Sequence, residues 1–240
     1  MRRRLAAALS ALAVLTAGCR AVPAARVTAD GYTEEEILAY FDELAFSSEY
    51  GGYRGTVCKW TEEIVYRIEG EVAAGELIVL SDLAARLNGI PGFPGIRMTD
   101  GTDEANFTLY FVMQGELAEY FGENARTASG MSRFTYRTSG GEIVRAEAGV
   151  ASNITPQAAK ASVICEEFLQ SLGLAADSYT YPESVFYEGY NDSLRPAPID
   201  WAVLELLYSE AIRPGMPRDE ALAAARRLLE SENETTEVAA

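Results

Sequence analysis

One helix is bounded by strong signals at both ends, and it constrains the fold of this chain most. Thr155 is a capping residue followed by Pro156 at the first helical position, and Gly173 is a typical C-terminal cap. Glu166 and Gln170, four residues apart, point together from one face. The neighbouring apolar stripe comprises Ala161, Ile164, Cys165, Phe168 and Leu172. We therefore expect an amphipathic helix between these two signals.

Strands and helices alternate along the rest of the chain. The capping box Thr33-Glu34-Glu35-Glu36 starts a helix, and Gly51-Gly52 ends it. Periodicity then predicts a strand at Lys59 to Glu69, a helix at Glu76 to Asn88, strands at Ile96 to Met98 and Asn106 to Val112, a polar stretch at Gly122 to Gly141, a sheet-edge strand at Glu142 to Ser152, and final helices at Ile199 to Tyr208 and Arg218 to Glu230. The length of 240 residues fits one globular domain.

The N-terminus carries the features of an export signal. Three arginines precede an apolar run from Leu5 to Leu15, which is too short for a permanent membrane-spanning helix. The run leads to Thr16-Ala17-Gly18-Cys19, which resembles a bacterial lipobox, although an aliphatic residue is preferred where Thr16 stands. Cleavage before Cys19 would leave this residue lipidated, whereas an ordinary secretory signal would be cut near Ala25. Both alternatives export the chain.

These signals predict four segments: a lipoprotein signal peptide at 1–18, a tether at 19–31, a single domain at 32–232 and a flexible tail at 233–240. The expected location is the bacterial cell envelope, with lipidated Cys19 as the contact to the membrane. Because Arg20 follows the cysteine, we expect the periplasm-facing outer membrane in a diderm cell. In a monoderm cell we expect the outer face of the plasma membrane.

Charge and the absence of histidine exclude several classes of function. The formal charge of −16 becomes −19 without Arg2, Arg3 and Arg4, so the mature protein repels nucleic acid. No histidine occurs, which excludes histidine-ligated zinc, copper or haem, a histidine general base and a Ser/His/Asp triad. We therefore expect no nucleic-acid partner and no cofactor.

The helix described first has the residue spacing of a zinc-protease helix but lacks the metal-binding histidines. Metzincins carry the motif H-E-x-x-H-x-x-G-x-x-H. The residues of this chain at its five defined positions are, in order, Glu166, Glu167, Gln170, Gly173 and Ala176. Glutamate and glutamine oxygens are poor substitutes for imidazole at a tetrahedral zinc site, and alanine cannot ligate. Adding Asp177 still supplies too few oxygens for calcium or magnesium. We therefore expect no metal.

The resemblance to metzincins extends beyond this helix and covers roughly Lys59 to Met216. Matrixin-type proteases place a methionine turn next, and here Ser184-Val185-Phe186-Tyr187 follows, with Phe186 in place of the methionine. Ile199-Asp200 and Leu207-Tyr208 match the segment after that turn. The resemblance implies an α+β, zincin-like fold: a mixed sheet of mostly four to five strands on two main helices, with additional N- and C-terminal helices.

The chain also resembles domain of unknown function 2927, a family of exported bacterial proteins. Members look like C-x-x-E-E-L-T-Q-x-L-G-L-x-x-D-S, S-I-F-N and L-Y-x-x-x-I-x-P-G-M. The matching segments here are Cys165 to Ser178, Ser184 to Tyr187, Leu207 to Met216, Glu49 to Gly52 and Lys59-Trp60. Tyr187 departs from the usual asparagine. The family implies a fold and no established activity.

The site residues favour binding over catalysis. Glu166 and Glu167 diverge by about 100° around the helix, so they do not converge on one substrate atom. We expect Glu166 to hydrogen-bond to backbone or to Arg133 or Arg137 instead. The chain is then a non-catalytic pseudo-metalloprotease of the envelope that binds or assembles through its relict cleft. The alternatives are a hydrolase or peptidase with Glu167 as general base and an atypical metal or none, and an envelope domain without a cleft function.

Two further features leave alternatives open. The tyrosine-rich loop Tyr179 to Tyr190 is either a rim for a peptide, protein or glycan partner or the aromatic packing of a long turn. If Cys19 is lipidated, Cys58 and Cys165 remain as two thiols in an oxidising compartment. In a zincin-like fold the sheet lies against the helix, which favours a Cys58–Cys165 disulfide. The alternative is that Cys165 is a buried free thiol.

Overall fold

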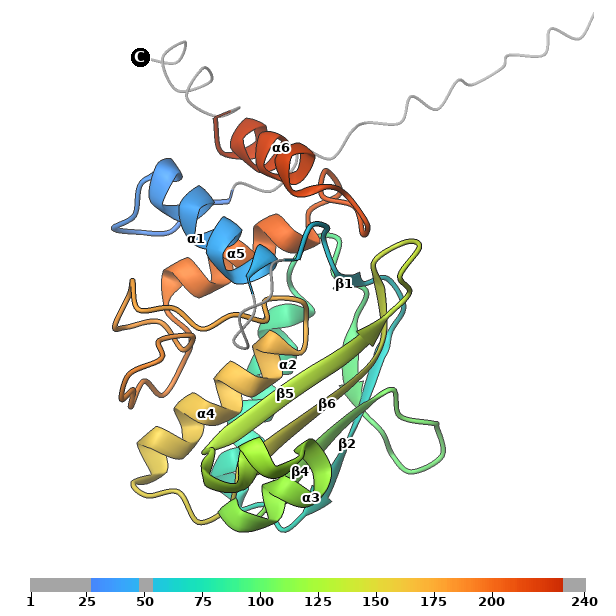
Figure 1. Cartoon of the computed structure of the whole chain (residues 1–240), viewed down its shortest axis with the longest axis vertical. Coiled ribbons are helices and arrows are strands. Elements are labelled where there is room, and N and C mark those ends of the chain that lie inside the picture. Colours follow the sequence, from blue (N-terminus) through green and yellow to red (C-terminus); the bar gives the residue numbers. More distant parts are fainter. Residues whose placement is uncertain (1–26, 48–53, 231–240) are drawn as a thin grey trace, which may run out of the picture.

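The computed structural model describes residues 27–47 and 54–230 (Figure 1). Its elements are α1 (Glu34–Phe46), β1 (Lys59–Trp60), β2 (Ile64–Gly70), α2 (Ala74–Leu87), β3 (Ile96–Met98), β4 (Phe107–Val112), η1 (Gln114–Glu116), α3 (Leu117–Phe121), η2 (Glu123–Thr127), β5 (Gly130–Tyr136), β6 (Glu142–Ala151), α4 (Gln157–Gln170), α5 (Pro198–Tyr208) and α6 (Arg218–Glu230). None of these helices is long and apolar enough to cross a membrane. The predicted signal peptide, Cys19 and the Gly51-Gly52 helix end lie outside the described residues.

The six strands found among the described residues form one mixed, mostly parallel sheet. The strand order is β1-β6-β4-β2-β3, and β5 pairs with β6 beside it. Every pair is parallel except β5 with β6, which is antiparallel. The predicted mixture of a sheet with several helices is therefore confirmed.

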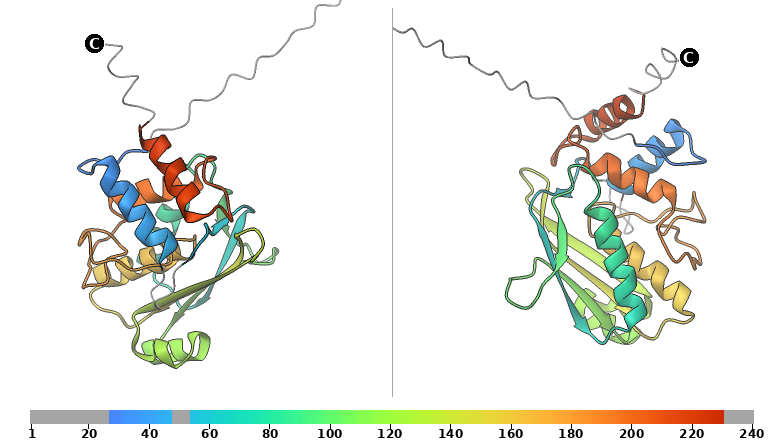
Figure 2. Two further views of the ribbon diagram at one scale, coloured as in Figure 1. Left: turned by 45° about the horizontal axis from the view of Figure 1, so that its top comes forward. Right: turned by 180° about the vertical axis from the view of Figure 1, so that it is seen from behind.

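α2 and α4 lie side by side on one face of this sheet (Figures 1 and 2). Phe168 of α4 packs on the sheet, with its ring centroid 5.7 Å from that of Tyr66 and 5.2 Å from that of Phe107. This contact explains why the apolar stripe of α4 is buried. α1, α5 and α6 gather at one end of the sheet, where α1 packs on the other two.

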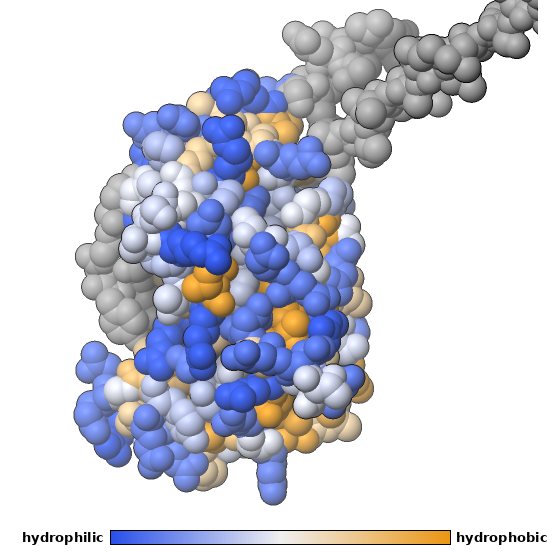
Figure 3. All heavy atoms as spheres, turned by 90° about the vertical axis from the view of Figure 1, so that its right-hand side faces the viewer, coloured by the Kyte–Doolittle hydropathy of each residue, from blue (hydrophilic) through white to orange (hydrophobic). Residues whose placement is uncertain are grey.

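The opposite face of the sheet is covered in part by α3. Tyr110 of β4 lies 4.3 Å from Tyr120 of α3, measured between ring centroids. A small apolar cluster joins α3 and η2 to the sheet; it consists of Leu117, Ala125, Met131 and Ala151. Figure 3 shows hydrophilic and hydrophobic residues interspersed on this side of the molecule.

Two neighbouring side chains of β1 close the C-terminal ends of two helices. The ammonium group of Lys59 donates to the carbonyls of Leu207, Ser209 and Ile212, at 2.9, 3.3 and 2.7 Å. The indole of Trp60 donates to the carbonyl of Ser171 at 3.0 Å. The last carbonyls of a helix have no intrahelical donor, so β1 supplies donors to the ends of both α4 and α5.

The predicted glycine turn after α4 is present at Gly173, two residues beyond Ser171, which is the C-cap of the helix. Gly173 has a φ of +121°, and a Cβ at this position would collide with the carbonyl oxygen of Cys58. Only glycine therefore permits both the left-handed turn and the close approach of the chain leading into β1. At its other end the helix begins at Gln157 with Pro156 as N-cap, one residue later than predicted.

Three predictions about the sheet were wrong in part. The strand predicted over Lys59 to Glu69 is two strands, and β1 pairs with β6 while β2 lies between β3 and β4. β6 is not at the sheet edge, because β4 and β5 flank it; its exposed polar residues come from its outward face. The polar stretch at Gly122 to Gly141 contains β5 as well as η2. Apolar residues of β5 face both sides of the sheet, so they show no period of two.

Candidate functional site

α4 presents Glu167 and Gln170, two of the residues implied by the metzincin resemblance, to the antiparallel strand β5. Both side chains are buried. A Cβ at Gly130 would collide with the Glu167 carboxylate and with Val163, so glycine in β5 leaves the room that this carboxylate occupies. Ser132, two residues further along β5, donates its hydroxyl to Gln170 Oε1 at 2.9 Å. Through these contacts α4 packs directly against β5.

The Gln170 amide is held at both ends. Its Nε2 donates to Asp177 Oδ1 at 2.5 Å, while its oxygen accepts from Ser132. The amide therefore links β5, α4 and the chain that follows the Gly173 turn. We call Gly130, Ser132, Glu167, Gln170 and Asp177 together the α4–β5 site.

The donor set of this site does not fit a zinc ion. The oxygen of Gln170 already accepts from Ser132, and Ala176, which the metzincin resemblance places at the third ligand position, is buried and has no side-chain atom that could bind a metal. Within residues 27–47 and 54–230 no three His, Cys, Asp or Glu side chains are grouped so as to hold a metal. Tetrahedral zinc sites use imidazole, thiolate or carboxylate ligands, which this arrangement does not bring together.

The predicted pairing of Glu166 with Arg133 is not formed. Arg133 lies on the other face of the sheet, where its guanidinium is 2.6 Å from Glu147 Oε2 and 5.1 Å from the Phe121 ring. Successive residues of a strand point to opposite faces, so Ser132 faces α4 and Arg133 faces away. Arg137 lies beyond the end of β5, with its backbone N–H bonded to the Glu142 carbonyl.

Asp200 anchors the turn that carries Phe186, the residue predicted to replace the turn methionine. Its carboxylate accepts from the Ser184 hydroxyl at 2.6 Å and from the N–H groups of Val185 and Ala197 at 3.1 and 2.7 Å. Complete burial raises the pKa of Asp200 to about 6, against the effect of these hydrogen bonds. Phe186 is itself fully buried. The turn is therefore packed into the core and tied to the start of α5 by hydrogen bonds.

The tyrosine-rich loop contains both packed and exposed aromatic side chains. Tyr181 packs edge-on against Tyr32 and Tyr40 of the α1 region, with ring centroids 5.3 and 4.9 Å apart. Tyr179 and Tyr190 are instead exposed. One tyrosine thus secures the loop by packing, while a contact of the two exposed tyrosines with a partner stays a prediction.

The predicted disulfide is not present, because Cys58 and Cys165 are both buried free cysteines. The Cys58 carbonyl lies against Gly173, beyond the end of α4. α4 rises by about 7.5 Å between Cys165 and its last residue, Gln170. That rise alone exceeds the Cα separation of about 4.4–6.8 Å that a disulfide spans. Burial raises the pKa of Cys165 to about 12, which is typical of a buried free thiol.

A buried ion pair that the sequence analysis missed joins α2 to α4. Lys160 Nζ lies 2.9 Å from Glu76 Oε1 and donates to the Ser152 carbonyl at 2.6 Å. The second oxygen of Glu76 accepts from the Ala73 N–H at 2.7 Å and so caps α2. A lysine within the apolar first half of α4 was the available sequence signal.

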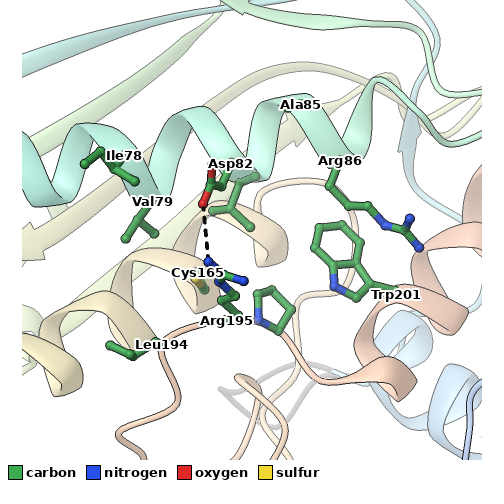
Figure 4. Close-up of a pocket in the computed structure, with 11 residues that line it drawn as sticks. Ile78, Val79, Asp82, Ala85, Arg86, Cys165, Leu194, Arg195 and Trp201 are labelled. Atoms are coloured by element: carbon green, nitrogen blue, oxygen red, sulfur yellow. Dashed lines mark ion pairs between the residues drawn. The ribbon is translucent and has the colours of Figure 1, made fainter.

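The sequence analysis also missed a groove between α2 and the chain that enters α5 (Figure 4). It encloses about 800 Å³. Its apolar lining includes Ile78, Val79 and Leu83 of α2, Leu194 and Pro196 of the connecting loop, and Trp201 of α5. We call these six residues, with Asp82, Arg86, Arg195 and Cys165, the α2 groove. Its residues are far apart in sequence, so no local motif indicates it.

Comparison with known proteins identifies one family. The family model described as "Protein of unknown function (DUF2927)" matches residues 34–227, from α1 into α6. No curated protein matches the chain.

Proposed function

This chain belongs to the DUF2927 family, whose description names no activity, and we propose on that premise that it is a non-catalytic binding domain of the bacterial cell envelope. Its ligand in this proposal is an extended peptide segment that adds to strand β5 at the α4–β5 site. The exposed tyrosines Tyr179 and Tyr190 supply further contacts with the bound segment.

The open edge of β5 is the observation that carries this proposal. Among the described residues, β5 pairs with β6 on one side and with no strand on the other. The Ala151 N–H bonds to the Ser129 carbonyl, and in an antiparallel pair such bonded positions alternate. The backbone groups of Gly130, Ser132 and Phe134 therefore point away from β6. Unpaired groups of this kind bind added strands.

The surroundings of Glu167 favour binding over hydrolysis. Glu167 packs over Gly130 and is buried, which favours a structural role over that of a general base facing substrate. Gln170 is neutral and is hydrogen-bonded through both its oxygen and its nitrogen, and the chain contains no histidine. The alternative, a hydrolase or peptidase that uses Glu167, would require this carboxylate to reach a substrate-bound water.

We further propose that the domain is a degenerate zincin-like domain. The order strand, helix, strands, helix, turn and helix, from β2 to α5, supports this proposal. So does the position of α4 on the sheet, with Glu167 directed to β5 and the Gly173 turn after it. The lipidation of Cys19 and the envelope location are part of the same proposal, and the N-terminal sequence supports them.

The test is a selection of displayed random heptapeptides on the purified protein, followed by affinity measurements with two variants. Ser132→Pro removes the outward N–H of β5 and keeps the pairing with β6, whereas Ser132→Ala removes only the hydroxyl. We expect the proline variant to lose binding of the selected peptide and the alanine variant to retain it. Equal binding by both folded variants would contradict strand addition at β5.

A further inference from the structure

The α2 groove has the dimensions and the apolar surface of a ligand site. Its volume of about 800 Å³ lies within the usual range for small-molecule pockets, about 300–1,000 Å³. Two of its apolar side chains, Ile78 on α2 and Leu194 on the loop, are each 61% exposed. Large apolar residues left open to water beside a groove indicate a surface that a ligand covers.

The floor of the groove limits the chemistry of that ligand. Cys165 of α4 lines it, and its raised pKa keeps the thiol neutral and unreactive. Val79, Leu83 and Pro196 complete an apolar lining. A sugar or nucleotide would bury hydroxyl groups or ring nitrogens there without partners, which is costly. An unbranched hydrocarbon chain has no such groups.

The rim of the groove carries two arginines in a chain of formal charge −16. Arg195 is paired only loosely, because its guanidinium is 4.0 Å from Asp82 and the two side chains are 82% and 61% exposed. Arg86 lies over the Trp201 ring, 5.4 Å from its centroid, and 3.3 Å from Glu205. Figure 4 shows Asp82 and Arg195 facing each other, between Ile78 and Leu194 on one side and Arg86 and Trp201 on the other.

From this arrangement we propose that the α2 groove binds a long-chain carboxylate, the anion of a fatty acid. The hydrocarbon chain lies on Ile78, Leu83 and Leu194. The carboxylate replaces Asp82 as the partner of Arg195, because a bidentate charge-assisted contact is stronger than an exposed pair at 4.0 Å. Binding is non-covalent, and it is independent of the peptide proposed for β5.

Trp201 provides a direct measurement. The chain has two tryptophans, and Trp60 is buried in the core, so a ligand in the groove changes mainly the fluorescence of Trp201. The probes are dodecanoate, dodecanol and dodecyltrimethylammonium, which share one chain length and differ in head-group charge. We expect saturable binding of dodecanoate, at least about tenfold tighter than that of the cation. Trp201→Phe should abolish the signal.

Charge variants test the head group. Arg195→Gln should weaken dodecanoate binding by about tenfold, and Asp82→Asn should strengthen it, because the competing carboxylate is removed. Neither change should alter the binding of dodecanol. Equal affinity for all three probes, or no response of dodecanoate to either variant, would overturn the proposal.

A matched pair of surface variants tests the location. Ile78→Asp places a charge in the apolar part of the groove, and Met98→Asp places one at an exposed apolar residue of β3, outside the groove lining. We expect the first to abolish dodecanoate binding and the second to leave it unchanged. Equal loss in both, or no saturable binding to the unchanged protein, would show that the groove is not the site.

Discussion

The Trp60 indole donates its N–H to the carbonyl of Ser171 at 3.0 Å, so a strand that precedes α4 by almost a hundred residues closes the end of that helix. Trp60 is in β1, and Ser171 directly follows α4. Tyr208, at the end of α5, donates to the next carbonyl, that of Leu172, at 2.8 Å. The segments Lys59-Trp60 and Leu207-Tyr208 therefore meet at one junction.

Replacing Trp60 by phenylalanine should destabilise the protein by about 2–3 kcal/mol. The smaller ring leaves a gap in the core, and the buried Ser171 carbonyl loses its donor. Urea denaturation followed by circular dichroism measures the change. Trp201→Phe is the matched control, since Trp201 is only partly buried and should cost less than about 1 kcal/mol. Equal effects would contradict the assigned role of Trp60.

The buried Lys160–Glu76 pair should be strongly coupled. Lys160→Met leaves the Glu76 carboxylate buried without its cation, for which we expect a loss of about 3 kcal/mol. The double variant Lys160→Met with Glu76→Gln should lose less than the sum of the two single changes. Arg226→Met is the control, because its pair with Glu230 is exposed and should be worth less than about 1 kcal/mol. Strict additivity would argue against coupling.

Much of the helical structure could be predicted from sequence. Both the Thr33 capping box and the Gly173 turn act locally, through hydrogen bonds and a backbone conformation that the residue types specify. The helices over Ile199 to Tyr208 and Arg218 to Glu230 were predicted to within one residue. These signals need no knowledge of the tertiary fold.

The elements and sites that were missed depend on tertiary contacts. β5 has apolar residues on both faces because Met131 meets the α3 cluster and Phe134 packs toward the main core. The Lys160–Glu76 pair and the α2 groove join segments that are far apart in the chain. In the α4–β5 site, Glu167 and Gln170 were identified from the helix, but their partners in β5 were not. The spacing of apolar residues shows which face of a helix or strand is buried. It does not show which other segment that face contacts.

Stability should depend on pH through Asp200. Its pKa is raised from 3.8 to about 6 in the folded protein, so the folded state binds this proton more tightly than the unfolded state does. The contribution is fully present below about pH 4 and is lost as the pH rises through about 6, with a limit of about 3 kcal/mol. Unfolding free energies between pH 4 and 7 should fall less steeply in Asp200→Asn than in the unchanged protein. Parallel curves would contradict this assignment.

Lipidation is tested at Cys19. We expect the unchanged protein, expressed in a bacterium, to incorporate radiolabelled palmitate and to fractionate with membranes. Cys19→Ala should abolish the label and reduce the fraction that sediments with membranes, because the lipid on Cys19 is the proposed anchor. Cys58→Ala is the control and should retain the label, since Cys58 is buried in the folded domain. A labelled Cys19→Ala variant would contradict the lipobox interpretation.

Substitution of Glu167 distinguishes a binding domain from a hydrolase. Glu167→Gln keeps the shape of the side chain over Gly130, so we expect the free energy of unfolding to change by less than about 1 kcal/mol and peptide binding to remain. Gly130→Ala is the contrasting variant: its methyl group collides with Glu167 and Val163, and strain of this kind costs about 1–3 kcal/mol. Chemical denaturation and peptide affinity measure both variants. If the protein hydrolyses a peptide and Glu167→Gln abolishes that hydrolysis without unfolding, the carboxylate is a general base, and the binding-only function is wrong.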